Sequence, residues 1–144
     1  MTEVAFHFNA PDKQAYACRL LRKAVAGGAR VVVTAPADTL ATLDTLLWTF
    51  SQTDFIAHAR APGDAELIAA SPVVLTETPS ATGLPHRQVL VNLGTELPGG
   101  FEQYQRVIEV VSLDEDDRQQ ARRRWKHYTE RGYAIQRHDL NLKT

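Results

Sequence analysis

The feature of this sequence that most limits its fold is the short run ARVVVTA at residues 29–35, which is apolar and β-branched at its centre, Val31–Val33. Strands with one face in water alternate apolar and polar residues, whereas an unbroken β-branched run is typical of a strand covered on both faces. Two stretches with helical spacing flank this run, one from Asp12 to Ala26 and one in PADTLATLDTLLWTF at residues 36–50. A covered strand between two helices predicts a three-layer α/β domain with a mostly parallel sheet and helices on both faces.

Both expected helices carry one apolar stripe at helical spacing. In the first helix the stripe contains Ala17, Leu20, Leu21, Ala24 and Val25, and in the second it contains Leu40, Leu43, Leu47 and Phe50. Gly27-Gly28 is expected to end the first helix, because glycine readily adopts the left-handed conformation of a helix C-cap.

Five further segments have the composition of strands. They are VAFHF at 4–8, DFIAHA at 54–59, PVVLTE at 72–77, QVLVNL at 88–93 and RVIEVV at 106–111. The last three have little helix between them, so part of the sheet is expected either to be antiparallel or to cross over by loops. A final helix is expected to begin with Ser112-Leu113-Asp114-Glu115, which matches a capping box, and to end at Gly132.

Length, charge and cysteine content limit the class of protein. A chain of 144 residues is the size of one domain, so we expect residues 1–144 to form a single domain. A formal net charge of −1, from 16 basic and 17 acidic residues, argues against a protein that coats DNA through bulk charge. One cysteine, no signal-peptide pattern and no apolar stretch of membrane-spanning length indicate a cytoplasmic protein that does not enter a membrane.

A three-layer α/β fold prompts a search for a nucleotide site, which needs a phosphate-binding loop between a strand and the next helix. The first two strands are followed by NAPDKQAY and TAPADTL, and neither contains a glycine-rich phosphate-binding motif. The histidines and Cys18 have no metal-ligand spacing, and no nucleophile elbow is present. We therefore expect a Rossmann-like domain without a nucleotide site, with no catalytic residue, metal or cofactor. A small nucleotide-binding enzyme with an atypical phosphate loop is the alternative.

The final helix contains the most distinctive segment, RQQARRRWKHYTERGY at residues 118–133. At about 100° per residue, Arg118, Arg122 and Lys126 follow one ridge of the helix. Trp125 lies about 20° to one side of Arg118, toward the expected core. Trp125 is therefore expected at a boundary, with apolar surface on one flank and three cations on the other.

Two interpretations of this ridge are open. In the first, Trp125 packs and the cations keep the helix face in water. In the second, the ridge binds a ligand with an apolar side chain and carboxylates, because arginine pairs with carboxylates and an aromatic ring floors an apolar pocket. Single-stranded nucleic acid would suit the same residues, but the near-zero net charge and the acidic run at 114–117 favour a short acidic peptide. Arg123 and Arg124 point elsewhere and are expected in solvent.

The segments LDTLLWTFSQTDFIAH, RQVLVNL and ARRRWKHYTERGY, in this order, resemble the chi subunit of the bacterial replicative DNA polymerase III holoenzyme. The resemblance covers nearly the whole chain and rests on the order and spacing of these motifs together with the chain length. It implies a nucleotide-binding-like α/β domain without nucleotide-binding function. It also implies two partners: the psi subunit of the clamp loader, and the acidic, phenylalanine-terminated tail of single-stranded DNA-binding protein.

The resemblance assigns roles to five residues of the tail site. Arg122 would receive the terminal carboxylate of the tail, and Trp125 and Val111 would line an apolar pocket for its last side chain. Arg118 and Lys126 would attract the acidic residues that precede it. DNA would be contacted only indirectly, through the bound partner.

Two other features follow from the resemblance. Gln120 stands where relatives can have an apolar residue, which predicts a shallower pocket in this chain. The psi-binding region would include Trp48 and Phe55, although large aromatic residues near a helix end are commonly part of the core.

Overall fold

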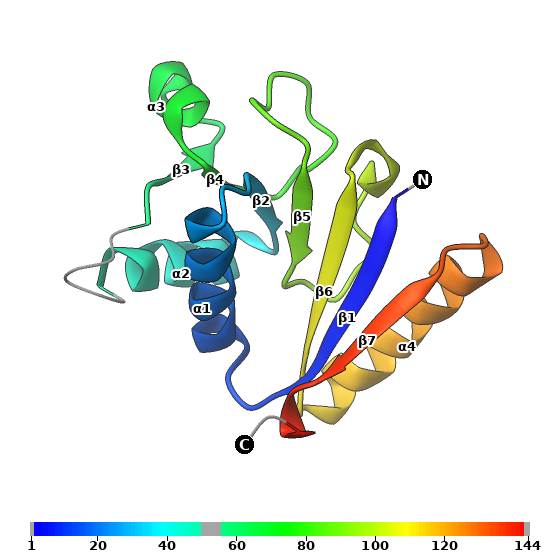
Figure 1. Ribbon diagram of the computed structural model, residues 1–144. Helices are drawn as coiled ribbons and strands as arrows, with labels where there is room; N and C mark the ends of the chain where they lie inside the picture. Colours follow the sequence, from blue (N-terminus) through cyan, green and yellow to red (C-terminus); the bar gives the residue numbers. More distant parts are fainter. Residues whose placement is uncertain (1, 50–55, 143–144) are drawn as a thin grey trace.

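The computed structural model describes residues 2–49 and 56–142, and in this part of the chain a seven-stranded sheet runs through the molecule (Figure 1). The strands are β1 (Glu3–Ala10), β2 (Val31–Thr34), β3 (His58–Ala61), β4 (Val73–Thr76), β5 (Val89–Asn92), β6 (Arg106–Ser112) and β7 (Ile135–Asp139). Their order in the sheet is β3-β4-β2-β5-β6-β1-β7. Every neighbouring pair is parallel, which confirms the expected parallel α/β class.

The connections of β4, β5 and β6 resolve the open question about the middle of the chain. These strands are parallel, so each connection returns from the carboxyl end of one strand to the amino end of the next. Residues 77–88 join β4 to β5 as a loop, and residues 93–105 join β5 to β6 with one short 3-10 helix, η1 (Phe101–Gln103). The sheet therefore crosses over by loops here, and none of these strands is antiparallel.

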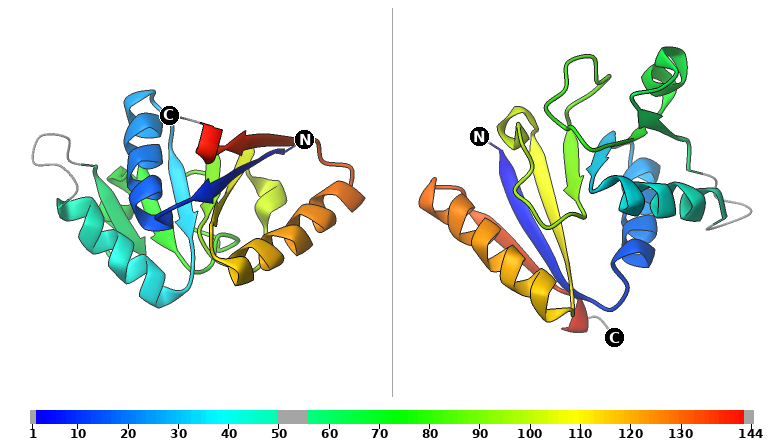
Figure 2. Two further views of the ribbon diagram at one scale, coloured as in Figure 1. Left: turned by 90° about the horizontal axis from the view of Figure 1, so that it is seen from below. Right: turned by 180° about the vertical axis from the view of Figure 1, so that it is seen from behind.

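The helices cover both faces of the sheet. They are α1 (Lys13–Ala26), α2 (Ala37–Thr49), α3 (Ala65–Ala70) and α4 (Glu115–Glu130). Core side chains of α1 and α2 pack with Val31 and Val33 on one face, whereas those of α3 and α4 pack with Val32 on the other. Figure 2 shows α1 and α2 next to each other and α4 at the opposite end of the sheet.

In β2 and in the apolar stripe of α2, buried residues lie where the sequence pattern predicted. All four residues of β2 are buried, as expected of a strand covered on both faces. Leu40, Leu43 and Leu47 of α2 are also buried, and Phe50 lies outside the described residues.

Three elements differ from the sequence-based expectation. The segment expected as a strand at 54–59 enters the sheet at His58, while residues 54–55 lie outside the described part of the chain. Helix α3 and strand β7 were not predicted, because six residues are too few for a clear helical period and IQRHD does not alternate apolar and polar residues. Strand β7 lies at an edge of the sheet, where a polar sequence is tolerated.

The start of α4 also differs from the expected capping box. Asp114, not Ser112, is the N-cap, and its side chain accepts a hydrogen bond from the Asp117 backbone N–H. Ser112 is still the last residue of β6, and its hydroxyl donates to the Asp117 carboxylate at 2.8 Å. The strand therefore runs one residue further than expected, and the N-cap lies two residues later than the motif suggested.

A buried polar network fixes α4 to the sheet. Arg124 was expected in solvent, and this was wrong: it is 3% exposed. Its Nε donates to Oε1 of Glu109, a fully buried residue of β6, at 3.0 Å, and its Nη1 donates to the Thr95 carbonyl at 2.7 Å. A guanidinium is buried here because a carboxylate from another element neutralises it, and helical spacing alone cannot reveal such a partner.

Two further side chains donate hydrogen bonds to the Glu109 carboxylate. Asn92 Nδ2 donates to Oε1 at 2.9 Å, and the Tyr128 hydroxyl donates to Oε2 at 2.9 Å. Burial raises the pKa of the Glu109 carboxyl above its ordinary value, while the Arg124 charge and these hydrogen bonds oppose that rise. The network thus joins β5, β6 and α4 at one point inside the core.

We expect Arg124→Ala to lower the free energy of unfolding by about 3–5 kcal/mol, because it leaves the buried Glu109 carboxylate without its cation. Urea unfolding at pH 7, monitored by circular dichroism, measures this change in the free energy of unfolding.

Two variants control this experiment. Arg123→Ala removes the adjacent, exposed arginine and should change the free energy of unfolding by less than about 0.5 kcal/mol. Combining Arg124→Met with Glu109→Gln removes both charges and keeps the space filled, so this protein should be more stable than Arg124→Ala. If Arg124→Ala is as stable as the wild type, the pair does not hold α4 to the sheet.

Candidate functional site

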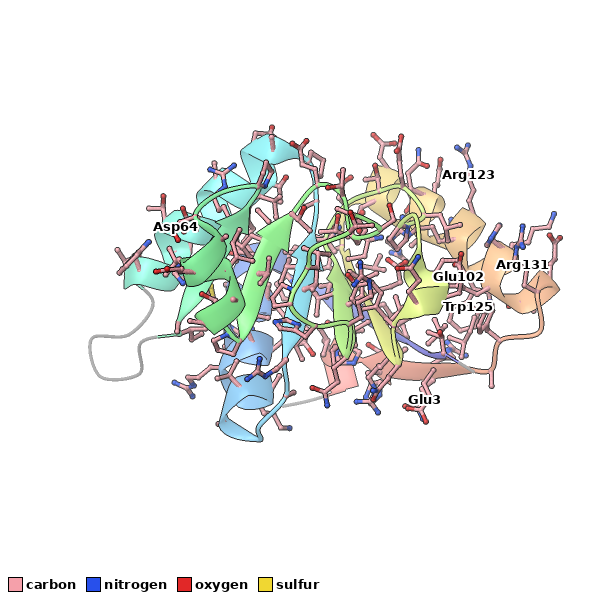
Figure 3. All side chains as sticks on the ribbon, turned by 90° about the horizontal axis from the view of Figure 1, so that it is seen from above. Glu3, Asp64, Glu102, Arg123, Trp125 and Arg131 are labelled. Carbon is pink, nitrogen blue, oxygen red and sulfur yellow. The ribbon has the colours of Figure 1, made fainter. Side chains whose placement is uncertain are left out.

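The outer side of α4 presents the cations that the sequence placed there. Arg118, Arg122 and Lys126 are exposed, and Trp125 is half-buried. The Trp125 ring packs against Phe6 of β1, with ring centroids 5.0 Å apart. In Figure 3, Arg123 projects from the outer side of α4 and Trp125 lies on the side that faces the sheet. Trp125 is therefore a boundary residue, as its spacing indicated.

A cavity of about 320 Å³ opens beside α4, near the carboxyl ends of β1 and β6. It is lined by Phe6, Phe8, Asn9, Val111, Ser112, Arg118, Ala121, Arg122, Trp125 and Arg137. Four of the five residues that the resemblance assigned to a tail site thus line one cavity. The fifth, Lys126, is not in the lining: its side chain is 78% exposed, and its Nζ lies 3.9 Å from the Glu130 carboxylate.

The charged side chains that line this cavity are all cations. Its lining contains the three cations Arg118, Arg122 and Arg137 and no aspartate or glutamate. Arg122 Nη1 lies 3.4 Å from the Glu115 carboxylate, but both side chains are more than half exposed. Such a pair contributes little and is easily exchanged for another carboxylate. The cavity combines an apolar floor with cations in its lining, which suits a ligand that is both apolar and anionic.

Several lining residues were missed by sequence reasoning. Alternation in the strand at 4–8 does put Phe6 and Phe8 on one face, but it does not say which helix covers that face. Arg137 comes from β7, whose pairing with β1 leaves no pattern in the sequence. The Arg137 guanidinium carbon lies 5.5 Å from the centroid of the Phe8 ring and 5.8 Å from that of the Trp125 ring.

The start of α4 is anchored next to the cavity. Asp117 accepts hydrogen bonds from the backbone N–H and hydroxyl of Ser112, both at 2.8 Å, and from Lys13 Nζ at 3.0 Å. Burial alone would raise the pKa of the Asp117 carboxyl, but the Ser112 bonds and the Lys13 charge outweigh it and lower that pKa below its ordinary value. Because Ser112 lines the cavity, these contacts fix one of its walls.

Of the two residues expected to contact psi, the structure describes Trp48 but not Phe55. Trp48 lies near the end of α2 and is 61% exposed, so it is not a core residue. Its ring meets that of buried His58 edge to face at 5.3 Å, and His58 Nε2 lies 2.7 Å from the Asp44 carboxylate. Phe55 lies outside the described residues. Trp48 and the cavity belong to helices at opposite ends of the sheet (Figure 2).

The helix starts that could hold phosphate carry aspartates instead. Asp12 caps α1 by accepting from the Ala15 N–H at 3.1 Å, and Asp38 in the first turn of α2 accepts from the Thr39 N–H at 2.9 Å. These carboxylates take the position that an anion would occupy and repel it. In residues 2–49 and 56–142, no three His, Cys, Asp or Glu side chains are grouped to hold a metal ion. No helix in this part of the chain is long and apolar enough to cross a membrane.

Two comparisons with known proteins agree with each other. The model of a family described as "DNA polymerase III chi subunit, HolC" matches residues 1–136. The chain is also similar to a protein of Pseudomonas aeruginosa named "DNA polymerase III subunit chi", with 38% identity over 125 residues. That alignment covers 86% of this chain and 84% of the relative.

Asp117→Asn is expected to lower the free energy of unfolding at pH 7 by about 1–3 kcal/mol, because it weakens the bonds to Ser112 and Lys13. A carboxyl whose folded pKa is lowered adds stability above its unfolded pKa of about 4, and this stability is lost as pH falls through the folded pKa. The difference between wild type and variant should therefore shrink at acidic pH. Urea unfolding of both proteins between pH 7 and pH 3 measures it.

Asp116→Asn is the matched control, since Asp116 is the exposed neighbour in the same helical turn. It should change stability little at any pH. Similar losses for the two variants at pH 7 would contradict the anchoring role of Asp117.

Proposed function

Since the chain belongs to the DNA polymerase III chi subunit family, we propose that it is a non-catalytic adaptor subunit of the polymerase III clamp-loader complex. In this role it joins the complex through the psi subunit. It also binds the acidic C-terminal tail of single-stranded DNA-binding protein. The adaptor therefore links the replication machinery to protein-coated single-stranded DNA.

The observation that carries the tail-binding part of this proposal is the cavity beside α4. Its lining joins an aromatic floor to three arginines and contains no acidic side chain. An acidic peptide that ends in phenylalanine offers matching groups: an aromatic side chain, a terminal carboxylate and further carboxylates. Charge-assisted bonds between arginine and carboxylate are among the stronger polar contacts in proteins.

Each residue of the site has a proposed role. Arg122 pairs with the terminal carboxylate, while Trp125 and Val111 contact the terminal phenylalanine. Arg118 attracts an acidic side chain that precedes it. Lys126 lies outside the cavity lining and acts at longer range, within the distance of about 8–10 Å over which charges are felt at physiological salt.

The second contact uses Trp48 as an anchor for psi. Large exposed aromatic residues commonly dominate the binding energy of protein interfaces. The edge contact with His58, itself bonded to Asp44, supports a fixed orientation of the indole. Because α2 and α4 lie at opposite ends of the sheet, an adaptor of this shape can hold both partners at once (Figure 2).

The proposed adaptor contacts DNA only through its partner and works in the cytoplasm. A formal net charge of −1 gives little nonspecific attraction to a polyanion. The alternative of a nucleotide-binding enzyme is disfavoured by the aspartates at the starts of α1 and α2.

Arg122→Ala is expected to weaken binding of the tail peptide by about ten- to a hundredfold, because losing a charge-assisted pair costs about 1.5–3 kcal/mol. Calorimetric titration of both proteins with one acidic, phenylalanine-terminated peptide measures the change. The fold should be retained, since Arg122 is exposed and alanine is a good helix former.

Arg123→Ala is the matched control for net charge, because Arg123 projects about 100° away from Arg122 and is not part of the cavity lining. A peptide without the terminal phenylalanine should bind poorly to every variant. Equal weakening by the two substitutions would mean that bulk charge, and not a carboxylate site at Arg122, attracts the peptide.

Trp48→Ala is expected to weaken binding of psi by at least about 2 kcal/mol, or roughly thirtyfold, while tail binding is unchanged. Leu67→Ala is the matched control, because Leu67 is 56% exposed but lies on α3. Titration with purified psi, with circular dichroism as a check of folding, measures both. Wild-type affinity for psi in the Trp48→Ala protein would exclude Trp48 from the interface.

A further inference from the structure

Arg137 is the one cation of the cavity lining that does not belong to α4. It lies on β7, so it approaches the cavity from the sheet, whereas Arg118 and Arg122 approach from the helix. The family match covers residues 1–136, so Arg137 lies just outside it.

The position of Arg137 leaves its charge available. Its guanidinium lies over the rings of Phe8 and Trp125, at 5.5 and 5.8 Å from their centroids. A guanidinium within about 6 Å of a ring centroid is attracted to the ring, and its N–H groups can still donate to a carboxylate.

Asp139, the nearest acidic residue along β7, is hydrogen-bonded to residues other than Arg137. Asp139 follows Arg137 by two residues, which puts both side chains on the same face of β7. Its carboxylate accepts from Asn9 Nδ2 at 2.8 Å and from the Asn141 N–H at 3.0 Å. No ion pair joins Arg137 to an acid of residues 2–49 or 56–142.

The three arginines of the cavity indicate how many carboxylates the ligand carries. One carboxylate is well satisfied by a single bidentate arginine, so three arginines around one apolar floor suit a ligand with more than one carboxylate. Arg122 precedes Trp125 by three residues on the same helix, and Arg137 lies over the Trp125 ring from β7. The indole is therefore flanked by cations from two elements.

We propose that Arg137 pairs with a side-chain carboxylate of the acidic tail, close in sequence to its apolar last residue, while Arg122 receives the terminal carboxylate. This inference rests on the proposed function of the cavity as a tail site. It makes Arg137 a specificity-determining residue: the site distinguishes tails with an acidic residue near the C-terminus from tails that are only apolar at the end.

The test is a set of calorimetric titrations of the full chain with three synthetic peptides. The parent peptide has two aspartates followed within three residues by a C-terminal phenylalanine. The second has both aspartates replaced by asparagine, and the third has a C-terminal amide. The proteins are wild type, Arg137→Met, Arg137→Lys, Arg122→Met and the charge control Arg123→Met.

Arg137→Met should weaken binding of the parent and amide peptides by about five- to tenfold and leave the weaker asparagine peptide almost unchanged. Arg122→Met should show the reverse pattern, with its loss confined to peptides that have a free terminal carboxylate. Arg137→Lys keeps the charge but not the planar fork, so its affinity for the parent peptide should lie between those of wild type and Arg137→Met.

The outcomes separate this inference from the proposed function. Equal loss of the parent and asparagine peptides in Arg137→Met, or no loss of either, overturns the pairing of Arg137 with a side-chain carboxylate. If Arg122→Met still loses affinity for the parent peptide, the tail site itself stands. Absence of parent-peptide binding to wild type overturns both. Arg137 is exposed, so its variants should unfold at the wild-type temperature, which thermal denaturation checks.

Discussion

The bond between the buried carboxylate of Glu109 and the guanidinium of Arg124 determines how α4 sits on the sheet. Two of the four buried residues of α4, Asp117 and Arg124, are charged, so apolar packing provides only part of its attachment. Hydrogen bonds depend on direction as well as distance, so these contacts fix both the rotation and the position of the helix.

That rotation decides what the helix presents to solvent. Trp125 follows Arg124 directly, so with Arg124 held inward, the indole lies at the edge of the core against Phe6. The same rotation turns Arg118 and Arg122 outward to the rim of the cavity. A polar contact inside the core and a cationic surface outside it are thus two consequences of one helix orientation.

The sheet places the two candidate binding surfaces far apart. Helices α2 and α4 cover opposite faces and stand at opposite ends of the sheet (Figure 2). Trp48 on α2 and the cavity beside α4 therefore face different directions, and neither depends on the other for its geometry. Two separate surfaces on one sheet fit the proposed role of an adaptor between two partners.

The sequence by itself determined the α/β class, the two-sided burial of β2 and the face of α4 that carries Arg118, Arg122 and Trp125. These features follow from local periodicity, which is set by backbone geometry within a few residues. Only the tertiary structure decided that Arg124 is buried and that Arg137 joins the cavity. Their partners, Glu109 and the aromatic rings of β1 and α4, lie on other elements. Contacts between elements depend on the order of strands in the sheet, and no short-range pattern records that order.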